Sequence, residues 1–330
     1  MSTPLELSFV TLDVFTTKRF AGNPLAVVHV PNGVTVAQET KQTVAREFNF
    51  SETVFLHEAT GDGGRDYPVD IFTIDQELPF AGHPTIGTAS HVLSKTATAD
   101  AAATLLVKAG RIPIERVGPA GPADPLVVRA AVPHDVHVHA GHLRTTPGID
   151  AVRDAGAIGH GDPAIAAAEL DAPVVSIVRG MTFVLVRLAS LAQLGVVSAS
   201  SPGLDFARLP DLLDKGPWGP EAGGPVSRYY YVVTDASEEG VTNIRTRMIG
   251  WAEEDAATGS AACTLASYLT LTLTAGAKDK RLLRYNVTQG VEMGRRSDIL
   301  VEVQAATDGR IEGVFLGGSA VEVSRGTIRV

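Results

Sequence analysis

Two stretches of this chain share one design: Gly82-His83-Pro84-Thr85-Ile86-Gly87-Thr88-Ala89 and Asp255-Ala256-Ala257-Thr258-Gly259-Ser260-Ala261. In each stretch a titratable residue precedes an apolar helix that opens with small residues, and we expect these helices to end near Leu93 and Leu273. A helix N-terminus offers unpaired N–H groups and a partial positive charge, which suit a carboxylate. Small residues let a ligand approach the backbone closely. The repeated design predicts two related halves with a small anionic substrate in a cleft between them.

The composition excludes several classes of protein. The 330 residues carry a formal net charge of −9 and are 45% hydrophobic, and a chain of this length is expected to hold about two domains. Nucleic-acid binding needs a basic face, so we expect no nucleic-acid partner. Cys263 is the only cysteine, which excludes an intrachain disulfide and favours a reducing compartment. No G-x-G-x-x-G motif joins a strand to a helix, so a dinucleotide cofactor is not expected.

Two segments bear on targeting. Residues 1–15 lack a basic stretch followed by an apolar core, so we expect no signal peptide. Residues 256–277 carry no charge, but serine and threonine recur among them, which fits a helix buried inside a domain better than a bilayer span. We therefore expect a cytoplasmic protein without a membrane partner.

Most other segments have the short, β-branched or alternating pattern of strands. They are residues 8–15, 25–30, 53–57, 69–74, 104–108 and 111–117, and then 126–132, 174–178, 182–188, 229–234, 243–248, 286–289 and 299–304. Residues 36–48 have the spacing of a helix, with Asn49 as its C-cap. Each half therefore combines many strands with one central apolar helix, which predicts a duplicated α+β architecture rather than a βαβ alternation.

The Gly- and Pro-rich residues 118–125 form the clearest break in the chain. We expect a first lobe at residues 1–122 and a second lobe at residues 123–319, with residues 320–330 as a candidate strand of the first lobe.

Glu52 is a candidate proton carrier. In Ser51-Glu52-Thr53-Val54-Phe55-Leu56, strand alternation places Glu52 on the same face as Val54 and Leu56. A carboxylate among apolar neighbours loses hydration, which raises its pKa and suits it for proton transfer near neutral pH. The alternative is a glutamate on an edge strand that reaches solvent.

The remaining candidate residues each have an ordinary structural explanation when taken alone, as turn, loop, capping or first-turn residues. They are Asn23, Gly82, His83, Asp255, Gly259 and Ser260.

Taken together and in order, several segments resemble the phenazine-biosynthesis PhzF-like isomerase family. They are Phe20-Ala21-Gly22-Asn23-Pro24-Leu25-Ala26-Val27-Val28, Phe50-Ser51-Glu52-Thr53-Val54-Phe55, Phe72-Thr73, Glu77-Leu78-Pro79-Phe80-Ala81-Gly82-His83-Pro84-Thr85, Glu254-Asp255-Ala256-Ala257-Thr258-Gly259-Ser260-Ala261 and Gln289-Gly290-Val291-Glu292-Met293-Gly294-Arg295. The resemblance implies a diaminopimelate-epimerase-like fold: two similar lobes, each a curved, mostly antiparallel sheet wrapped around a central helix, with the active site between them. A homodimer is a candidate assembly for such a fold.

The resemblance also implies the roles of individual residues. Glu52 matches the acid/base glutamate of the family, and His83 and Asp255 match residues that bind substrate and assist proton movement. The residues expected to bind substrate are Gly82, Gly259, Ser260 and Asn23. The family it resembles is cofactor-free and moves a proton between carbons of a small carboxylate-bearing substrate, so we expect an isomerase with no cofactor and no metal.

Two further observations limit the mechanism. Ala256 stands where the family usually has proline, which loosens the turn before the second helix. Related racemases and epimerases on this fold use two facing cysteines, and with Cys263 alone a two-thiol mechanism is not available.

Two alternatives remain. His134, His137, His139 and His142 crowd one segment, and His137 and His139 would share a strand face, as in some zinc sites. A metal-dependent hydrolase built on these histidines is the first alternative, although no HExxH pattern accompanies them. The second is a non-catalytic protein that binds small acids and kept the fold but lost the chemistry.

Overall fold

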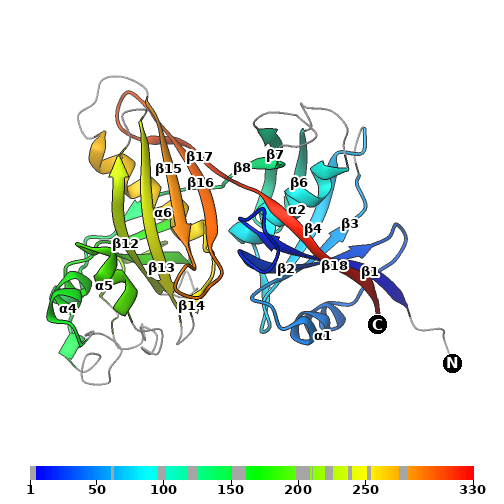
Figure 1. The fold of residues 1–330 in the computed structure, drawn as a ribbon, viewed down its shortest axis with the longest axis horizontal. Helices are drawn as coiled ribbons and strands as arrows, with labels where there is room; N and C mark the ends of the chain where they lie inside the picture. The colour runs from blue at the N-terminus through cyan, green and yellow to red at the C-terminus, as the bar shows by residue number, and fades with distance from the viewer. Residues whose placement is uncertain are drawn as a thin grey trace. The chain divides into compact units, whose positions relative to one another are not determined.

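The computed structural model describes residues 5–60, 63–95, 102–117, 125–150, 161–197, 209, 211–219, 226–236, 240–250, 254–274 and 281–330. The chain divides into two compact units (Figure 1). Unit 1 comprises residues 1–132, 295–298 and 315–330, and unit 2 comprises residues 133–294 and 299–314. The break expected at residues 118–125 lies almost entirely outside the described residues.

The elements of unit 1 are nine strands and two helices among its described residues. They are β1 (Glu6–Val14), β2 (Asn23–Val30), α1 (Gln38–Phe48), β3 (Thr53–His57), β4 (Asp66–Phe72), β5 (Glu77–Leu78), α2 (Gly82–Ser94), β6 (Ala102–Val107), β7 (Gly110–Val117), β8 (Val127–Ala131) and β18 (Ala320–Arg329). Strand pairing runs in the order β18, β1, β2, β3, β4, β6, β7, β8 and then the end of β17 (Ile311–Gly318). Because β17 leads directly into β18, the sheet curls almost completely around its interior.

The centre of unit 1 is α2, in which every residue from Gly82 to Leu93 is buried. It contacts strands on all sides, among them β1, β2, β3, β6, β7, β8 and β18. A helix enclosed in this way leaves little room for additional side-chain volume. Gly87 shows the limit: a Cβ there would lie 2.5 Å from Leu25 Cδ2 and 2.8 Å from Val14 Cγ2.

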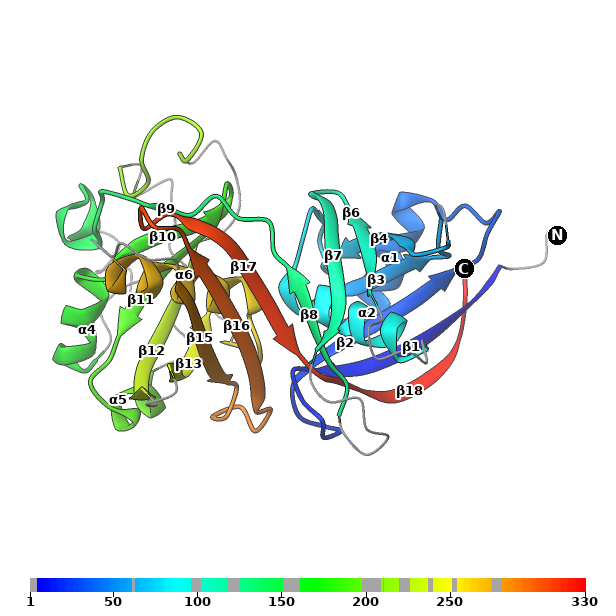
Figure 2. The same ribbon diagram turned by 90° about the horizontal axis from the view of Figure 1, so that it is seen from above.

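Unit 2 repeats this plan with a second buried helix. Its described elements are β9 (His137–Val138), a 3-10 turn η1 (Leu143–Thr145), α4 (Pro163–Leu170), β10 (Val174–Val178), β11 (Met181–Arg187), α5 (Leu191–Val196), β12 (Val226–Ala236), β13 (Val241–Ile249), β14 (Glu254–Asp255), α6 (Gly259–Leu273), β15 (Arg281–Gln289) and most of β16 (Ser297–Ala305). Pairing runs β9, β10, β11, β12, β13, β15, and β15 and β16 lie side by side (Figure 2). The central helix α6 is buried from Gly259 to Ser267 and contacts β10, β11 and β15.

The two units share a four-element motif. In unit 1, β4 is followed by the two-residue β5, which pairs antiparallel with the end of β4, then by α2, and then by β6 parallel to β4. In unit 2, β13, β14, α6 and β15 have the same order and the same pairing. The predicted duplicated α+β fold with a central apolar helix in each half is confirmed.

One detail differs from the sequence interpretation. The sheets are mostly antiparallel, but β2 and β3, β4 and β6, β11 and β12, and β13 and β15 are parallel pairs. Each pair has a helix in its connection, so local βαβ units do occur. The sequence shows no regular alternation of strands and helices, because extra antiparallel strands separate these βαβ units.

The predicted end of the first helix is confirmed, since Asn49 follows α1 with a left-handed φ of 51°. Among the described residues, no helix has both the length and the apolar content that a bilayer span requires.

Replacing Gly87 by alanine tests the tight enclosure of α2. We expect a loss of about 1–3 kcal/mol of stability, because the added methyl group overlaps Leu25 and Val14. Scanning calorimetry of the whole chain measures it. Gly195→Ala in α5 is the matched control, since a Cβ there meets nothing within 4 Å. Equal stability of the two variants would contradict the packing argument.

Candidate active site

The first cluster of predicted site residues lies in unit 1 and comprises Asn23, Glu52, Gly82 and His83. Asn23 begins β2, Glu52 immediately precedes β3, and Gly82 and His83 open α2. Asn23 and His83 are almost inaccessible, with 3% and 4% of their surface exposed. The parallel pairing of β2 with β3 brings the starts of both strands to one end of the sheet, and α2 begins at that end. The structure therefore gathers these four residues as the sequence predicts.

His83 lies between the other two polar side chains of this cluster. Its Nδ1 is 3.5 Å from Asn23 Nδ2 and 3.6 Å from Glu52 Oε2. Both distances exceed those of strong hydrogen bonds. Such long contacts are common in catalytic groups that tighten only around a substrate.

Glu52 has the environment of a proton carrier. Only 16% of its side chain is exposed, and burial raises its pKa from 4.5 to about 7, while a hydrogen bond with the Ser51 side chain opposes this rise. Its Oε2 is buried and makes no hydrogen bond with any part of the chain that the structure describes. Because β3 lies between β2 and β4, Glu52 is not on an edge strand, and the solvent-reaching alternative is wrong. A carboxyl group with this pKa is present in both protonation states near neutral pH.

The loop before Asn23 is held by a half-buried ion pair that the sequence analysis missed. Arg295 Nη2 donates to Asp13 Oδ1 at 2.6 Å and to the carbonyl of Ala21 at 3.1 Å, and its Nε donates to the carbonyl of Gly22 at 2.8 Å. The second carboxylate oxygen of Asp13 accepts from the backbone N–H of Phe20 at 2.6 Å. One guanidinium and one carboxylate thus bind the backbone of the loop at Phe20, Ala21 and Gly22.

Gly22 completes this turn. Its φ is +67°, and a Cβ would lie 2.2 Å from the carbonyl oxygen of Val14. Only glycine fits such a position without strain. The turn delivers Asn23 to the start of β2, beside His83.

The second cluster lies in unit 2 and comprises Asp255, Thr258, Gly259, Ser260 and Gln289. Asp255 ends β14, and its Oδ2 accepts from the Thr258 hydroxyl at 2.6 Å. Thr258, and not Asp255, is the N-cap residue of α6. The hydrogen bond from Thr258 closes the turn that proline at the position of Ala256 would otherwise stiffen.

Gln289 holds this turn from the end of β15. Its side-chain oxygen accepts from the Thr258 N–H at 3.2 Å and from the Tyr229 hydroxyl at 3.0 Å. Its side-chain nitrogen donates to the Asp255 carbonyl at 2.8 Å and to Thr258 Oγ1 at 3.0 Å. These four bonds saturate the amide, which is completely buried. Gln289 was quoted in the closing motif of the family, but its partners are too distant in sequence to be inferred.

Both central helices begin without a side-chain cap. The N-cap residues Ala81 of α2 and Thr258 of α6 make no capping hydrogen bond, and neither first turn holds an acidic residue. By contrast, Asp162 caps α4 and Ser190 caps α5. An anion at the openings of α2 and α6 stays a prediction, which the missing side-chain caps support.

Comparison with known proteins agrees with these features. The family model of phenazine biosynthesis-like proteins, PhzC-PhzF, matches residues 12–202 and 224–326. The chain is 32% identical to an uncharacterized isomerase of Mesorhizobium japonicum, over 97% of this chain and 98% of that protein. It is 42% identical to trans-2,3-dihydro-3-hydroxyanthranilate isomerase of Pseudomonas aeruginosa, over 24% of this chain and 28% of that protein.

Solved structures share the fold. A PhzF-family phenazine biosynthesis protein of Bacillus anthracis has a TM-score of 0.72 at 21% identity and covers 99% of this chain and 100% of its own. A hydroxyproline epimerase of Agrobacterium vitis has a TM-score of 0.59 at 14% identity and covers 98% of this chain and 93% of its own.

The pKa of Glu52 predicts a pH-dependent stability. Between pH 4.5 and about 7 the folded protein holds this proton more tightly than the unfolded chain, so stability falls as pH rises through that window. Glu52→Gln has no proton to release in this window, so its free energy of unfolding should not fall there. Relative to the native protein, we expect this variant to become more stable by roughly 3 kcal/mol as the pH rises from 4 to 8. Urea denaturation across this range measures the gain. The exposed Glu58→Gln serves as control, and a Glu52→Gln difference that is constant with pH would refute a raised pKa.

The role of Gln289 predicts a large difference between two variants. Gln289→Met leaves the Asp255 carbonyl and the Thr258 N–H without their side-chain partner, and each such loss costs about 1–3 kcal/mol. Tyr229→Phe removes one hydrogen bond and should cost about 1 kcal/mol. Calorimetry of the whole chain compares them. Equal losses would mean that the glutamine does not hold the turn.

Proposed function

The chain belongs to the PhzC-PhzF family of phenazine biosynthesis-like proteins and is an isomerase, and we propose that it moves a proton between carbons of a small carboxylate-bearing substrate without a cofactor. The single observation that carries this proposal is the buried Glu52 carboxyl group, with its pKa raised to about 7 and His83 at 3.6 Å. Such a group can take a proton from carbon and return it at neutral pH.

In the proposed reaction, Glu52 acts first as a base and then as an acid. Its carboxylate removes a proton from one carbon of the substrate, and the resulting carboxylic acid delivers a proton to another carbon. Burial favours the neutral form, so the carboxylate is a stronger base than a hydrated glutamate. His83 Nδ1 lies 3.6 Å from Glu52 Oε2, where it can pair with the carboxyl group, and Asn23 orients the imidazole.

The N–H groups at the openings of α2 and α6 are the proposed seats for substrate anions. Gly82 and Gly259 admit a ligand close to the backbone, and the fixed dipoles stabilise charge that develops in the transition state. Asp255 is the proposed second polar group, held by Thr258 and Gln289. That both clusters act on one substrate stays a prediction.

The first compound to try is trans-2,3-dihydro-3-hydroxyanthranilate, which is named for the Pseudomonas aeruginosa isomerase. It carries the carboxylate that the proposal requires. Other small amino and hydroxy acids follow in the same assay.

The two alternatives from the sequence have less support. Family membership favours an isomerase over a metal-dependent hydrolase. A protein that only binds acids would not need a buried, unbonded carboxylate oxygen such as Glu52 Oε2, which costs stability.

The proposal predicts that turnover in D2O places solvent deuterium on a carbon of the product. Glu52→Gln should lower the rate by about 10²–10⁴-fold, because general acid–base catalysis typically contributes this much. NMR or mass spectrometry of the product measures the exchange. Glu58→Gln should behave as the native protein, and full activity of Glu52→Gln would sink the proposal.

Asp255→Asn tests whether unit 2 takes part in the same reaction. We expect a rate loss of at least about tenfold in the deuterium assay, since the substitution removes the charge but keeps a side-chain oxygen. The exposed Asp308→Asn is the control. Unchanged turnover in Asp255→Asn would restrict the chemistry to Glu52 and His83.

A further inference from the structure

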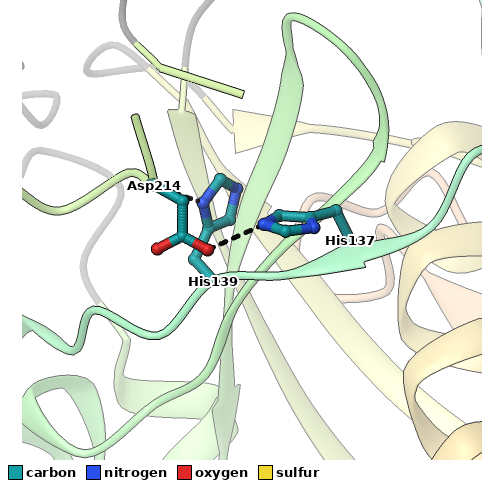
Figure 3. Close-up of side chains that lie close together, drawn as sticks. All are labelled: His137, His139 and Asp214. Carbon is teal, nitrogen blue, oxygen red and sulfur yellow. Dashed lines mark hydrogen bonds and ion pairs between the residues drawn. The ribbon is translucent and has the colours of Figure 1, made fainter. Parts of the chain in front are cut away.

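We propose that His137, His139 and Asp214 of unit 2 form a binding site for a divalent transition metal ion, Zn²⁺ in particular, separate from the residues assigned to isomerase chemistry. The proposal rests on the positions of three donor groups that two distant segments bring together. Figure 3 shows both imidazole rings turned toward the aspartate.

The donor atoms lie close enough to share one ion. One nitrogen from each histidine and one carboxylate oxygen of Asp214 lie within 4.8 Å of one another, and His137 Nε2 is 2.8 Å from Asp214 Oδ2. Bonds of about 2.0–2.2 Å in a tetrahedral zinc site place neighbouring ligand atoms roughly 3.3–3.5 Å apart. Small rotations of these side chains would reach that geometry.

His139 already has the tautomer that a metal ligand needs. Its Nδ1 accepts the backbone N–H of Asp214 at 3.0 Å, so this nitrogen carries the lone pair and Nε2 carries the proton. The Nε2–H group donates to Ser176 Oγ at 2.9 Å. A ligating histidine almost always makes such an outer hydrogen bond with its second nitrogen, which fixes the ring.

The ring of His137 is also held in place. His137 and His139 stand two residues apart around β9, so both side chains point to one face. The indole ring of Trp218 stacks on His137, with ring centres 4.6 Å apart and planes 8° from parallel. Asp214 is fixed in turn, because its carboxylate accepts the N–H of Ala140 at 3.2 Å.

An ion can reach the site, and its binding would break only a few of the hydrogen bonds that the donor groups now make. The side chains of His137 and Asp214 are 29% and 34% exposed, so an ion has access from solvent and water can supply a fourth ligand. The ion would replace the hydrogen bond between these two side chains and the N–H of Asp214 at His139 Nδ1. Two imidazoles and one carboxylate suit Zn²⁺ or Co²⁺ rather than Mg²⁺ or Ca²⁺.

The site would join two segments of unit 2. His137 and His139 flank the end of a strand, whereas Asp214 and Trp218 belong to the separate segment at residues 211–219. A bound ion would therefore stabilise the packing of that segment on β9.

Metal titration of the untagged full-length chain tests the proposal. After treatment with EDTA, calorimetric titration with Zn²⁺ should show one equivalent bound, and Co²⁺ should give the visible absorption of a tetrahedral site with nitrogen and oxygen ligands. Mg²⁺ at the same concentration should not bind. His137→Ala and Asp214→Asn should each weaken Zn²⁺ binding by at least about tenfold, and Ser176→Ala by about 10–100-fold.

His142→Ala is the matched control, since His142 contacts the carbonyl of Ala172 and not the three donors. It should bind Zn²⁺ like the native protein, and circular dichroism should show every variant folded. Absence of stoichiometric Zn²⁺ binding overturns the proposal. So does unchanged affinity in both His137→Ala and Asp214→Asn, or a loss confined to His142→Ala. None of these readouts depends on isomerase activity.

Discussion

The enclosure of one helix by a curled sheet is the constraint on which each unit depends. In unit 1, α2 has no exposed residue between Gly82 and Leu93, so its polar side chains, such as His83 and His91, are enclosed together with its apolar ones. The same enclosure leaves the start of the helix without a capping side chain and surrounds it with strand ends. This buried helix opens without a capping side chain, and the polar residues Asn23, Glu52 and His83 gather at its start. The same packing that encloses α2 therefore also brings the candidate catalytic residues together.

Much of this could be predicted from the sequence because the relevant signals are local. Small residues before an apolar run locate α2 and α6, and their repetition indicates the duplication. For Glu52 the sequence left a buried and a solvent-reaching position open, and the argument for burial was incomplete. Alternation places Glu52 with Val54, but Phe55 on the opposite face is just as buried, at 0% exposure for both. Glu52 is desolvated because β3 is an interior strand covered on both faces, which is a property of the sheet and not of the strand.

The features that were missed depend on contacts between distant residues. Asp13 and Arg295 are 282 positions apart, and nothing near Asp13 marks it as an ion-pair partner. Gln289 reaches Asp255 and Thr258 across more than thirty positions, and only the pairing of β15 with β13 brings them together. The segment with four histidines is a candidate metal site from the sequence alone. The structure selects His137 and His139 from it and adds Asp214, which no sequence pattern had connected to them.

The placement of β18 has a consequence for how the protein is made. This strand pairs with β1 along its whole length, so one flank of the first strand is covered only by residues 320–329. A ribosome synthesises β18 after all of unit 2. The nascent N-terminal half must therefore wait with an open sheet edge while the rest of the polypeptide emerges, and exposed edges of this kind invite aggregation. Biogenesis of this molecule thus depends on its latest-made strand, and a chaperone that shields β1 in the interval would have a clear physical task.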